Sequence, residues 1–372
     1  MNVDTPRVFI AATEQNTGKT TTSLGLYSAL GTTFNRIGFI KPVGQRFIEV
    51  EGKQIDEDSV LIRDTFGTEV PIEDMSPIAV EPEFTRRYIN HANNEALTKR
   101  IQRSFDRSAW EKDFSIIEGT GHAGVGSVFD LSNARVAKIL HSKVLLITPA
   151  GIGRPIDEAA LNAALFAKEG VEVIGVVMNK ALPDKMHSIA DIARRGFERL
   201  GLELLGVIPR ESMLAQPTLD QVCKHVKGDF FHGQELGRNH VVKVMIGAMS
   251  AANVFRGVAD DTLLVVPGDR EDIVLAALSR SREEDGGPLC GIVLSDNLRP
   301  GERILELMKE CPLPIIGSAM DSYSIASRIH SMTVKTLPGD VEKIDRIQKL
   351  VSEHVDIPRI LEKLGIPAVM PK

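Results

Sequence analysis

The chain has 372 residues, of which 43% are hydrophobic and 25% are charged, an average globular composition with enough length for two or three domains. A net charge of −6 and only 14 Phe, 3 Tyr and 1 Trp argue against a general binder of nucleic acid or of anionic membranes. The three cysteines lie far apart, and we find neither a signal peptide nor an apolar run that could span a membrane. We therefore expect a reduced, cytoplasmic protein without disulfides or a structural zinc site.

Short runs of Val, Ile and Leu recur in the first part of the chain, each followed by a loop with Gly or Pro and then by a helical pattern. Such apolar strands separated by helices are typical of a buried parallel sheet. The predicted strands are Val8–Ala12, Arg36–Ile40, Phe114–Ile117, Lys143–Thr148, Val171–Met178 and Leu202–Ile208. The predicted helices are Lys19–Gly31, Asp58–Thr65, Asn133–His141, Pro155–Lys168 and Asp184–Gly201. Residues 71–112 fit no such unit and are predicted to form a helical insertion.

The loop after the first predicted strand carries a phosphate-binding motif. Residues 13–20 read TEQNTGKT, which matches the P-loop pattern GxxxxGK[ST] except that Thr13 replaces the first Gly. Backbone N–H groups and the helix N-terminus would bind the β- and γ-phosphates, while Lys19 adds a positive charge and the Thr20 hydroxyl binds Mg²⁺. The motif predicts a P-loop NTPase fold, a three-layer α/β/α sandwich with a mostly parallel sheet and the ligand at the carboxyl ends of its strands.

A carboxylate partner for the metal is expected at the end of a neighbouring strand. The apolar run FSIIEG ends in Glu118, which we predict to bind Mg²⁺ directly or through water. The alternative is a strand-end acid without a metal. A second acid near the site would come from Asp56, Glu57 or Asp58, although these residues could equally form an N-cap cluster for the following helix.

Several segments together resemble one protein family. They are ATEQNTGKT at 12–20, KPVGQ at 41–45, Asp58, EGTG at 118–121, GRPIDE at 153–158 and VMNK at 177–180. Residues 1 to about 212 are thereby similar to the dethiobiotin synthetase and cobyrinic acid a,c-diamide synthase group of P-loop proteins. The segments look most like the dethiobiotin-synthetase-like domain that precedes the catalytic part of long bacterial phosphotransacetylases.

This resemblance implies ATP and Mg²⁺ as cofactors. It implies nucleotide-binding roles for Thr13, Glu14, Gln15, Asn16, Thr17, Gly18, Lys19, Thr20, Thr21 and Asn179, catalytic roles for Lys19 and Lys41, and Mg²⁺ ligation by Thr20, Asp58 and Glu118. Lys41 follows a strand end, where it would hold the γ-phosphate or a substrate anion; otherwise it is a surface lysine. Asn179 offers a donor and an acceptor to adenine; otherwise it caps a loop. Gln15, the Gln45-Arg46 pair and His122 depart from the dethiobiotin synthetase pattern, so the resemblance implies the nucleotide site rather than that enzyme's reaction.

A linker and a second αβ pattern follow Pro209. The predicted strands are His240–Ile246, Thr262–Val266, Cys290–Leu294 and Pro314–Ile316. The predicted helices are Leu219–His225, Glu271–Ser281, Gly301–Glu310 and Asp321–His330, with a solvated loop at Glu283–Gly287 and a helical stretch from Asp340 to Leu364.

The second pattern resembles the DRTGG domain that follows the P-loop domain in the same phosphotransacetylases. The matching segments are VPGDRED at 266–272, GIVL at 291–294 and MTVK at 332–335. Arg270 would bind a phosphate or carboxylate, unless its acidic neighbours simply cap the next helix. The predicted divisions are a P-loop domain at 1–212, a DRTGG-like domain at 217–335 and a C-terminal helical segment at 336–372.

Three functions are compatible with these motifs. The first is an ATP-binding module, related to the N-terminal region of phosphotransacetylase, that couples Mg-ATP to a DRTGG sensor or dimerisation domain. The second is an ATP-dependent ligase that activates a carboxylate or carbamate by γ-phosphoryl transfer. The third is a structural partner of a phosphotransacetylase. We expect no acetyltransferase domain in a chain of this length, a homodimer, and a small carboxylate metabolite as a further ligand.

Overall fold

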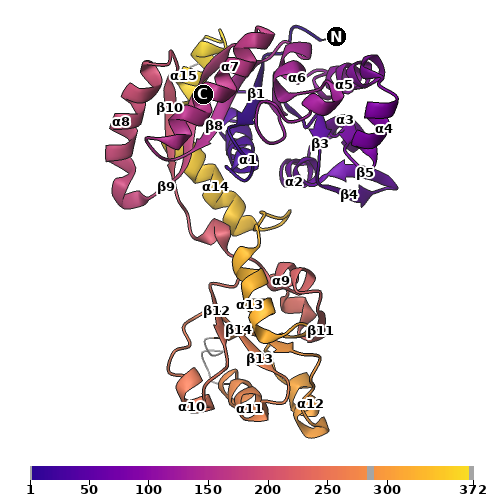
Figure 1. Cartoon of the computed structure of the whole chain (residues 1–372), viewed down its shortest axis with the longest axis vertical. Coiled ribbons are helices and arrows are strands. Elements are labelled where there is room, and N and C mark those ends of the chain that lie inside the picture. The colour runs from indigo at the N-terminus through magenta and orange to yellow at the C-terminus, as the bar shows by residue number, and fades with distance from the viewer. Residues whose placement is uncertain (1, 283–288, 368–372) are drawn as a thin grey trace. The chain divides into compact units, whose positions relative to one another are not determined.

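The computed structural model describes residues 2–282 and 289–367, so the predicted loop at Glu283–Gly287 lies outside the described residues. The chain divides into two compact units (Figure 1). Unit 1 consists of Met1–Glu211 together with Thr336–Lys372, and unit 2 consists of Ser212–Lys335. No helix in the described ranges is long and apolar enough to cross a membrane.

Unit 1 is built on a parallel sheet with helices on both faces. Its strands are β1 (Arg7–Ala12), β2 (Ile37–Ile40), β3 (Val43–Gly44), β4 (Phe47–Val50), β5 (Lys53–Asp56), β6 (Ile78–Ala79), β7 (Phe114–Glu118), β8 (Lys143–Pro149), β9 (Val173–Ala181) and β10 (Leu204–Pro209). Its helices are α1 (Lys19–Leu30), α2 (Glu57–Phe66), α3 (Ile72–Met75), α4 (Phe84–Asn90), α5 (Asn94–Ser108), α6 (Asn133–Ile139), α7 (Arg154–Glu169), α8 (Met186–Glu198), α14 (Val341–His354) and α15 (Ile357–Lys363).

Six of these strands form one sheet in the order β10-β9-β8-β1-β7-β2, and every neighbouring pair is parallel. The strand β1 lies near the middle, where its six residues are all buried. The register pairs Ile10 with Glu118 and Ile40 with Ile117. The carboxyl ends of β1, β2 and β7 therefore meet at one edge of the sheet, and this confirms the predicted α/β fold with a mostly parallel sheet.

The two faces of this sheet are covered by different helices. Phe9 packs with Phe105 of α5, Phe166 of α7 and Phe197 of α8 in one apolar core. The helices α1 and α14 contact each other and lie against strands of the sheet (Figure 1). Because successive side chains of a strand point to opposite faces, the fully buried Val8 and Ile10 of β1 face away from the core that contains Phe9.

The C-terminal segment packs on unit 1 after the chain has passed through unit 2. The helix α14 buries Ile344, Ile347, Leu350 and Val351. A Cβ atom at Gly25 of α1 would collide with Val351, so the missing side chain at Gly25 lets the two helices approach closely. After α14, Val355 forms an antiparallel bridge with Gly206 of the edge strand β10. The sequence predicted the helical character of this segment, and the structure adds the surface on which it lies.

Ion pairs connect α15 to the residue that precedes β10. Arg359 Nε and Nη2 donate to the two oxygens of Glu203 at 2.8 and 3.1 Å, and Lys363 Nζ lies 2.7 Å from Glu203 Oε2. The hydrogen bonds from Arg359 and Lys363 lower the pKa of Glu203 from 4.5 to about 2. The charged form of this carboxyl group therefore stabilises the packing of α15.

The lowered pKa predicts a pH-dependent contribution to stability. A carboxyl group whose folded-state pKa is lowered stabilises the fold above its ordinary pKa, and this contribution is lost as the pH falls toward the folded value. Because the pair is partly exposed, we expect Glu203→Gln to reduce the free energy of unfolding by only about 0.5–1 kcal/mol near pH 7. Urea denaturation of both proteins at several pH values would measure this difference in the free energy of unfolding.

The difference between wild type and Glu203→Gln should shrink as the pH falls from 4.5 toward about 2. Glu353→Gln, which changes an exposed acid on α14, is the control and should unfold like wild type at every pH. A destabilisation of the same size at all pH values would contradict the ion-pair explanation.

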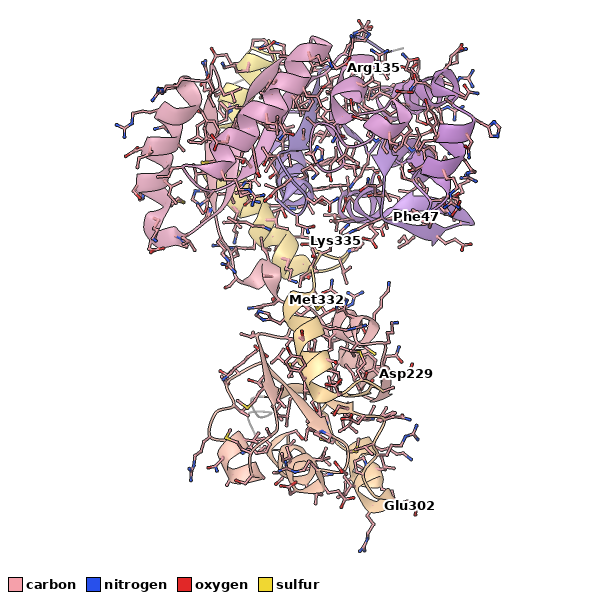
Figure 2. The ribbon with its side chains drawn as sticks, viewed as in Figure 1. Phe47, Arg135, Asp229, Glu302, Met332 and Lys335 are labelled. Carbon is pink, nitrogen blue, oxygen red and sulfur yellow. The ribbon has the colours of Figure 1, made fainter. Side chains whose placement is uncertain are left out.

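Unit 2 has a smaller mixed sheet. Its strands are β11 (Asp229–His232), β12 (Lys243–Ile246), β13 (Thr262–Pro267), β14 (Leu289–Ser295) and β15 (Ile315–Gly317). Its helices are α9 (Leu219–His225), α10 (Ala251–Val254), α11 (Glu271–Arg280), α12 (Glu302–Lys309) and α13 (Ser322–Ser331). The strand order is β11-β15-β14-β13-β12, with only β11 antiparallel to its neighbour. Figure 2 marks Asp229 at the edge strand β11 and Glu302 at the start of α12.

Two apolar cores cover the two faces of the unit 2 sheet. One contains side chains of α10, α11 and α12, and the other contains side chains of α9 and α13. Unit 2 is therefore also a three-layer αβ arrangement; the second pattern in the sequence predicted its αβ character, and the structure adds the layers.

Candidate functional site

The loop between β1 and α1 has the shape of a phosphate-binding loop. Gly18 adopts a left-handed backbone conformation (φ +101°) and α1 begins directly after it at Lys19. A Cβ atom at Gly18 would collide with the side-chain amide of Asn179, so the loop needs glycine both for its torsion angle and for space. The Thr17 hydroxyl donates to Glu14 O at 2.8 Å, and this hydrogen bond within the loop stabilises the turn. The first N–H groups of a helix provide a site for an anion.

The end of β9 holds this loop in place. Asn179 Nδ2 donates to Thr17 O at 2.8 Å, and Asn179 Oδ1 accepts from the N–H of Lys180. The Lys180 ammonium donates to Asn16 O at 2.6 Å. Asn179 thus acts as a loop-holding residue in this structure, and its contact with adenine stays a prediction. Sequence reasoning missed Lys180, although it stands directly after Asn179 in the VMNK segment.

The Thr13 side chain explains why the first glycine of the P-loop pattern is replaced. Thr13 is buried, its hydroxyl hydrogen-bonds to the Thr148 hydroxyl at 3.2 Å, and its backbone N–H donates to Ile147 O at 2.9 Å. Its carbonyl accepts from Asn162 Nδ2 at 3.4 Å. Thr13 therefore ties the start of the loop to β8 and α7.

The remaining loop residues lie nearer to solvent. Gln15 and Asn16 are exposed, and Thr21 is half-buried in the first turn of α1. Glu14 forms an ion pair with Arg154 at 3.1 Å. The structure therefore brings the predicted residues 13–21 together as one loop and helix start.

A buried cluster of charged side chains lies beside the loop. Lys41 Nζ is 3.2 Å from Asp56 Oδ1 and 3.3 Å from Glu118 Oε1, and it also contacts Asp58 Oδ2. The Thr20 hydroxyl donates to Glu118 Oε1 at 3.0 Å. The predicted residues Thr20, Lys41, Asp58 and Glu118 are therefore neighbours. The alternative of a surface lysine is wrong for Lys41, whose side chain is only 7% exposed.

Among the acids at the start of α2, the N-cap explanation is confirmed for Asp56, and the metal-binding explanation stays a prediction. Asp56 is the N-cap of α2, where its Oδ1 accepts from the N–H of Asp58 at 3.0 Å. Asp58, in the first turn, turns its carboxylate to Lys41. The chain reaches this point through the β4–β5 hairpin, whose turn is formed by Glu51 and Gly52 with positive φ angles.

Burial and charge act against each other in this cluster. Burial alone would lower the pKa of Lys41, but the carboxylates of Asp58, Glu118 and Asp56 raise it well above its ordinary value. Burial raises the pKa of Glu118; the Lys41 ammonium opposes this change, and the charge of Asp58 adds to it. Lys41 is therefore held as an ammonium group, and Glu118 is sensitive to any further positive charge.

The donor set suits Mg²⁺, which prefers oxygen ligands and is usually held by one or two carboxylates together with phosphate oxygens and water. Glu118 has no exposed surface, and its Oε2 has no hydrogen-bond partner in the described part of the chain. Among the described residues, no three or more His, Cys, Asp or Glu side chains are already arranged to hold a metal ion. The site therefore offers part of a Mg²⁺ coordination shell, from Thr20, Asp58 and Glu118. Phosphate oxygens or water would have to supply the remaining ligands.

In unit 2, the predicted anion-binding residue Arg270 is engaged within the protein. Its guanidinium makes two hydrogen bonds to the Asp272 carboxylate and one to Met249 O at 2.9 Å. A Cβ atom at Gly268 would collide with Leu298 O, so the loops after β13 and β14 are also in close contact. Arg270 therefore connects the ends of β12 and β13.

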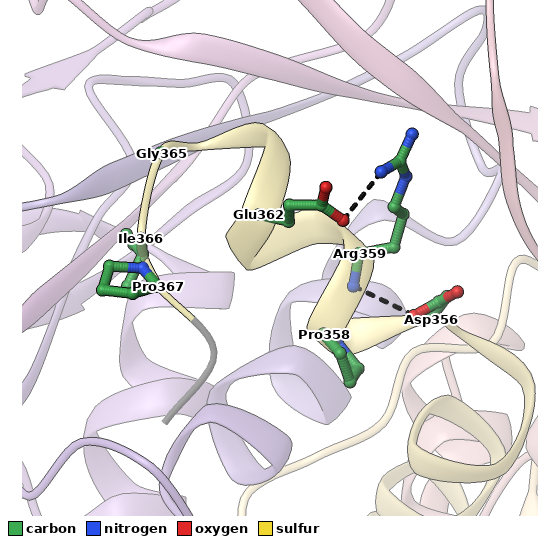
Figure 3. A pocket seen from close by; sticks show the side chains of 7 residues that line it. All are labelled: Asp356, Pro358, Arg359, Glu362, Gly365, Ile366 and Pro367. Atoms are coloured by element: carbon green, nitrogen blue, oxygen red, sulfur yellow. Dashed lines mark hydrogen bonds and ion pairs between the residues drawn. The ribbon is translucent and has the colours of Figure 1, made fainter. Parts of the chain in front are cut away.

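A hollow of 510 Å³ lies on the surface of α15 (Figure 3). It is lined by Asp356, Pro358, Arg359, Glu362, Gly365, Ile366 and Pro367. Its charged groups are satisfied locally, since Arg359 donates through Nη1 to Glu362 and through its backbone N–H to Asp356. The hollow contains none of the predicted site residues.

Comparison with protein families gives two matches. A family model described as an AAA domain matches residues 6–218, and a model described as a DRTGG domain matches residues 221–332. The chain is 27% identical to a phosphate acetyltransferase of Pseudomonas aeruginosa and 28% identical to one of Pseudomonas putida. Each alignment covers 96% of this chain and 52% of the relative, so the chain spans about half the length of the curated relatives it matches.

Comparison with solved structures gives partial alignments with low TM-scores. The MinD cell division protein of Aquifex aeolicus aligns with 56% of this chain and 83% of its own, with a TM-score of 0.36 and 15% identity. The CBS and DRTGG domains of the regulatory region of Clostridium perfringens pyrophosphatase align with 46% of this chain and 85% of their own, with a TM-score of 0.27 and 15% identity. The family matches confirm the order inferred from the motifs, a P-loop domain followed by a DRTGG domain as in phosphate acetyltransferases.

Proposed function

The chain belongs to the AAA domain family, whose model spans residues 6–218, and on that premise we propose that unit 1 binds ATP with Mg²⁺ and couples this binding to the DRTGG domain. The observation that carries the proposal is the P-loop itself. Its left-handed Gly18, its supports from β9 and the helix that starts at Lys19 form an anion site. The protein would act as a nucleotide-responsive regulatory module.

Within this proposal, each predicted residue has a defined task. The loop from Thr13 to Thr21 would bind the phosphates, Lys19 would neutralise their charge, and Asn179 would contact adenine after adjusting its bond to Thr17. Thr20, Asp58 and Glu118 would hold Mg²⁺, which when bound screens the phosphate charges. A cytoplasmic location, a homodimer and a small carboxylate ligand belong to the same proposal.

The experiment is a nucleotide screen with the full chain. We expect Mg-ATP to raise the melting temperature by several degrees, because a ligand at one hundred times its Kd stabilises the folded state by about 2.7 kcal/mol. GTP, CTP and ADP, each with and without Mg²⁺, establish the specificity. Lys19→Ala should lose the shift, and Lys53→Ala should keep it, because Lys53 is an exposed residue paired with Glu73.

The outcome separates the proposal from its alternatives. A chain that shows no shift with any nucleotide does not have the proposed activity. A shift that survives in Lys19→Ala would place the nucleotide somewhere other than the P-loop. A role in the cell that is unaffected by Lys19→Ala would favour a structural partner of a phosphotransacetylase.

A second candidate is an ATP-dependent ligase, and the observation in its favour is that Lys41 contacts Glu118, the acid that accepts from the Thr20 hydroxyl at the start of α1. In such a ligase, Lys19 and Lys41 would stabilise the transferring phosphoryl group. Phosphate release that rises several-fold above background with one small carboxylic acid would support the ligase. Release at background with every acid supports the regulatory module.

A further inference from the structure

Lys41 lies at the centre of three carboxylates. The side chains of Lys41, Asp56, Asp58 and Glu118 are all 7% exposed or less. Lys41 makes an ion pair with each acid, and Lys19 acts on Glu118 as a second positive charge. Three negative groups thus face two positive ones, in surroundings where uncompensated charge is costly. The Lys41 ammonium is the group that keeps the acids together.

The same place has the features of a cation site. Thr20 donates its hydroxyl hydrogen to Glu118 Oε1, and Glu118 Oε2 is buried without a hydrogen-bond partner among the described residues. A hydroxyl and carboxylate oxygens are ligands for hard divalent cations. Lys41 Nζ is 3.3 Å from Glu118 Oε1 and also contacts Asp58, the two acids predicted as metal ligands. The ammonium group therefore stands among the same oxygens that a divalent cation would use.

We propose that Lys41 is a tethered counter-ion, which holds the cation position while the P-loop is empty and so keeps divalent cations out of the nucleotide-free protein. A phosphate bound at the P-loop offers the ammonium a new anionic partner, and the four-carbon stem of lysine lets it follow. The acids are then released to a metal ion that arrives with the nucleotide. The inference rests on the proposed nucleotide site, and it makes metal binding conditional on nucleotide binding.

The test measures Mn²⁺ binding without nucleotide by electron paramagnetic resonance, with Mn²⁺ as the probe for Mg²⁺. We expect nucleotide-free wild type to bind Mn²⁺ weakly and Lys41→Met to bind it at least about tenfold more tightly, because a buried like charge has been removed. Lys53→Met, which removes an exposed lysine of the β4–β5 hairpin, is the matched control and should behave like wild type. Lys41→Met/Asp58→Asn should lose the gain.

A second variant keeps the test valid if Lys41→Met does not fold. Lys41→Met removes the ammonium group that pairs with three buried acids, whereas Lys41→Met/Asp56→Asn removes one charge of each sign and keeps Thr20, Asp58 and Glu118. Mn²⁺ should bind to this double variant more tightly than to wild type and should raise its melting temperature. The same readout from folded protein then answers the question even if the single variant is unstable.

The possible results also separate this inference from the proposed function. Equal Mn²⁺ binding by nucleotide-free wild type and by the folded Lys41 variants would overturn the counter-ion role, while a Mg-ATP shift in wild type would still support the nucleotide site. Tight Mn²⁺ binding by nucleotide-free wild type would also overturn it. Gained binding in the Lys41 variants supports it, whichever nucleotide the loop prefers.

Discussion

Replacing Gly18 by Ala is expected to weaken nucleotide binding strongly and to leave unit 1 folded. A non-glycine residue in the left-handed region costs about 1–2 kcal/mol, and here the added Cβ atom would also collide with Asn179. The loop would have to change shape, and its N–H groups would no longer converge on one anion. Isothermal titration with Mg-ATP should show an affinity at least about tenfold to a hundredfold lower, since each 1.4 kcal/mol is a factor of ten.

Gly170→Ala is the matched control, because it introduces the same torsional strain at a glycine outside the P-loop. Gly170 also has a positive φ angle (+75°), but a Cβ atom there would meet nothing within 4 Å. Gly170→Ala should therefore cost stability and keep nucleotide affinity. Wild-type affinity in Gly18→Ala would show that the phosphates bind elsewhere.

The second large effect concerns Gly25, where α1 contacts α14. Replacing glycine by alanine inside a helix ordinarily stabilises it by about 1 kcal/mol. At Gly25, however, the new Cβ atom would collide with Val351 and lie 3.1 Å from Ile347 O. Because overpacking costs about 1–3 kcal/mol, we expect Gly25→Ala to destabilise unit 1 despite its better helix propensity.

The sign of this effect should depend on the partner residue. In a Val351→Gly background both clashing atoms of that side chain, Cβ and Cγ2, are absent and only Ile347 O remains close, so Gly25→Ala should become neutral or stabilising by up to about 1 kcal/mol. Urea denaturation followed by the fluorescence of Trp110, the single tryptophan of the chain, reports on unit 1. If Gly25→Ala changes the stability equally in both backgrounds, the two helices are not in the contact described here.

Sequence reasoning identified the elements that follow strong periodic patterns. The six strands of the main sheet of unit 1 and the helix after the P-loop were predicted within a few residues, because buried apolar runs and the GKT motif are local signals. The hairpin β4–β5 is not predicted, since its strands are only four residues long and most of their side chains are exposed or half-buried, which leaves no clear alternation. The edge strand β11 was missed for a similar reason: it is short, and only alternate residues are partly buried.

Some features of the candidate site can likewise be predicted from the sequence, and others cannot. Lys19, Thr20 and Glu118 are visible from motif and strand context, and the structure places the last two in contact. The contacts of Lys41 with three acids depend on how the hairpin brings Asp56 and Asp58 back to the sheet, which no local pattern encodes. The packing of α14 and α15 on α1 could not be predicted either, because it joins segments far apart in the chain.

That last arrangement has a consequence for the order in which the protein is made. Unit 1 needs both Met1–Glu211 and Thr336–Lys372, so the ribosome completes unit 2 before it releases the helix that covers α1. Until then, the side of α1 that receives Val351, and the outer edge of β10 beside Gly206, lie open in the nascent chain. Domains generally fold as units during synthesis, so unit 1 can complete its fold only after α14 and α15 have been made, when unit 2 is already complete.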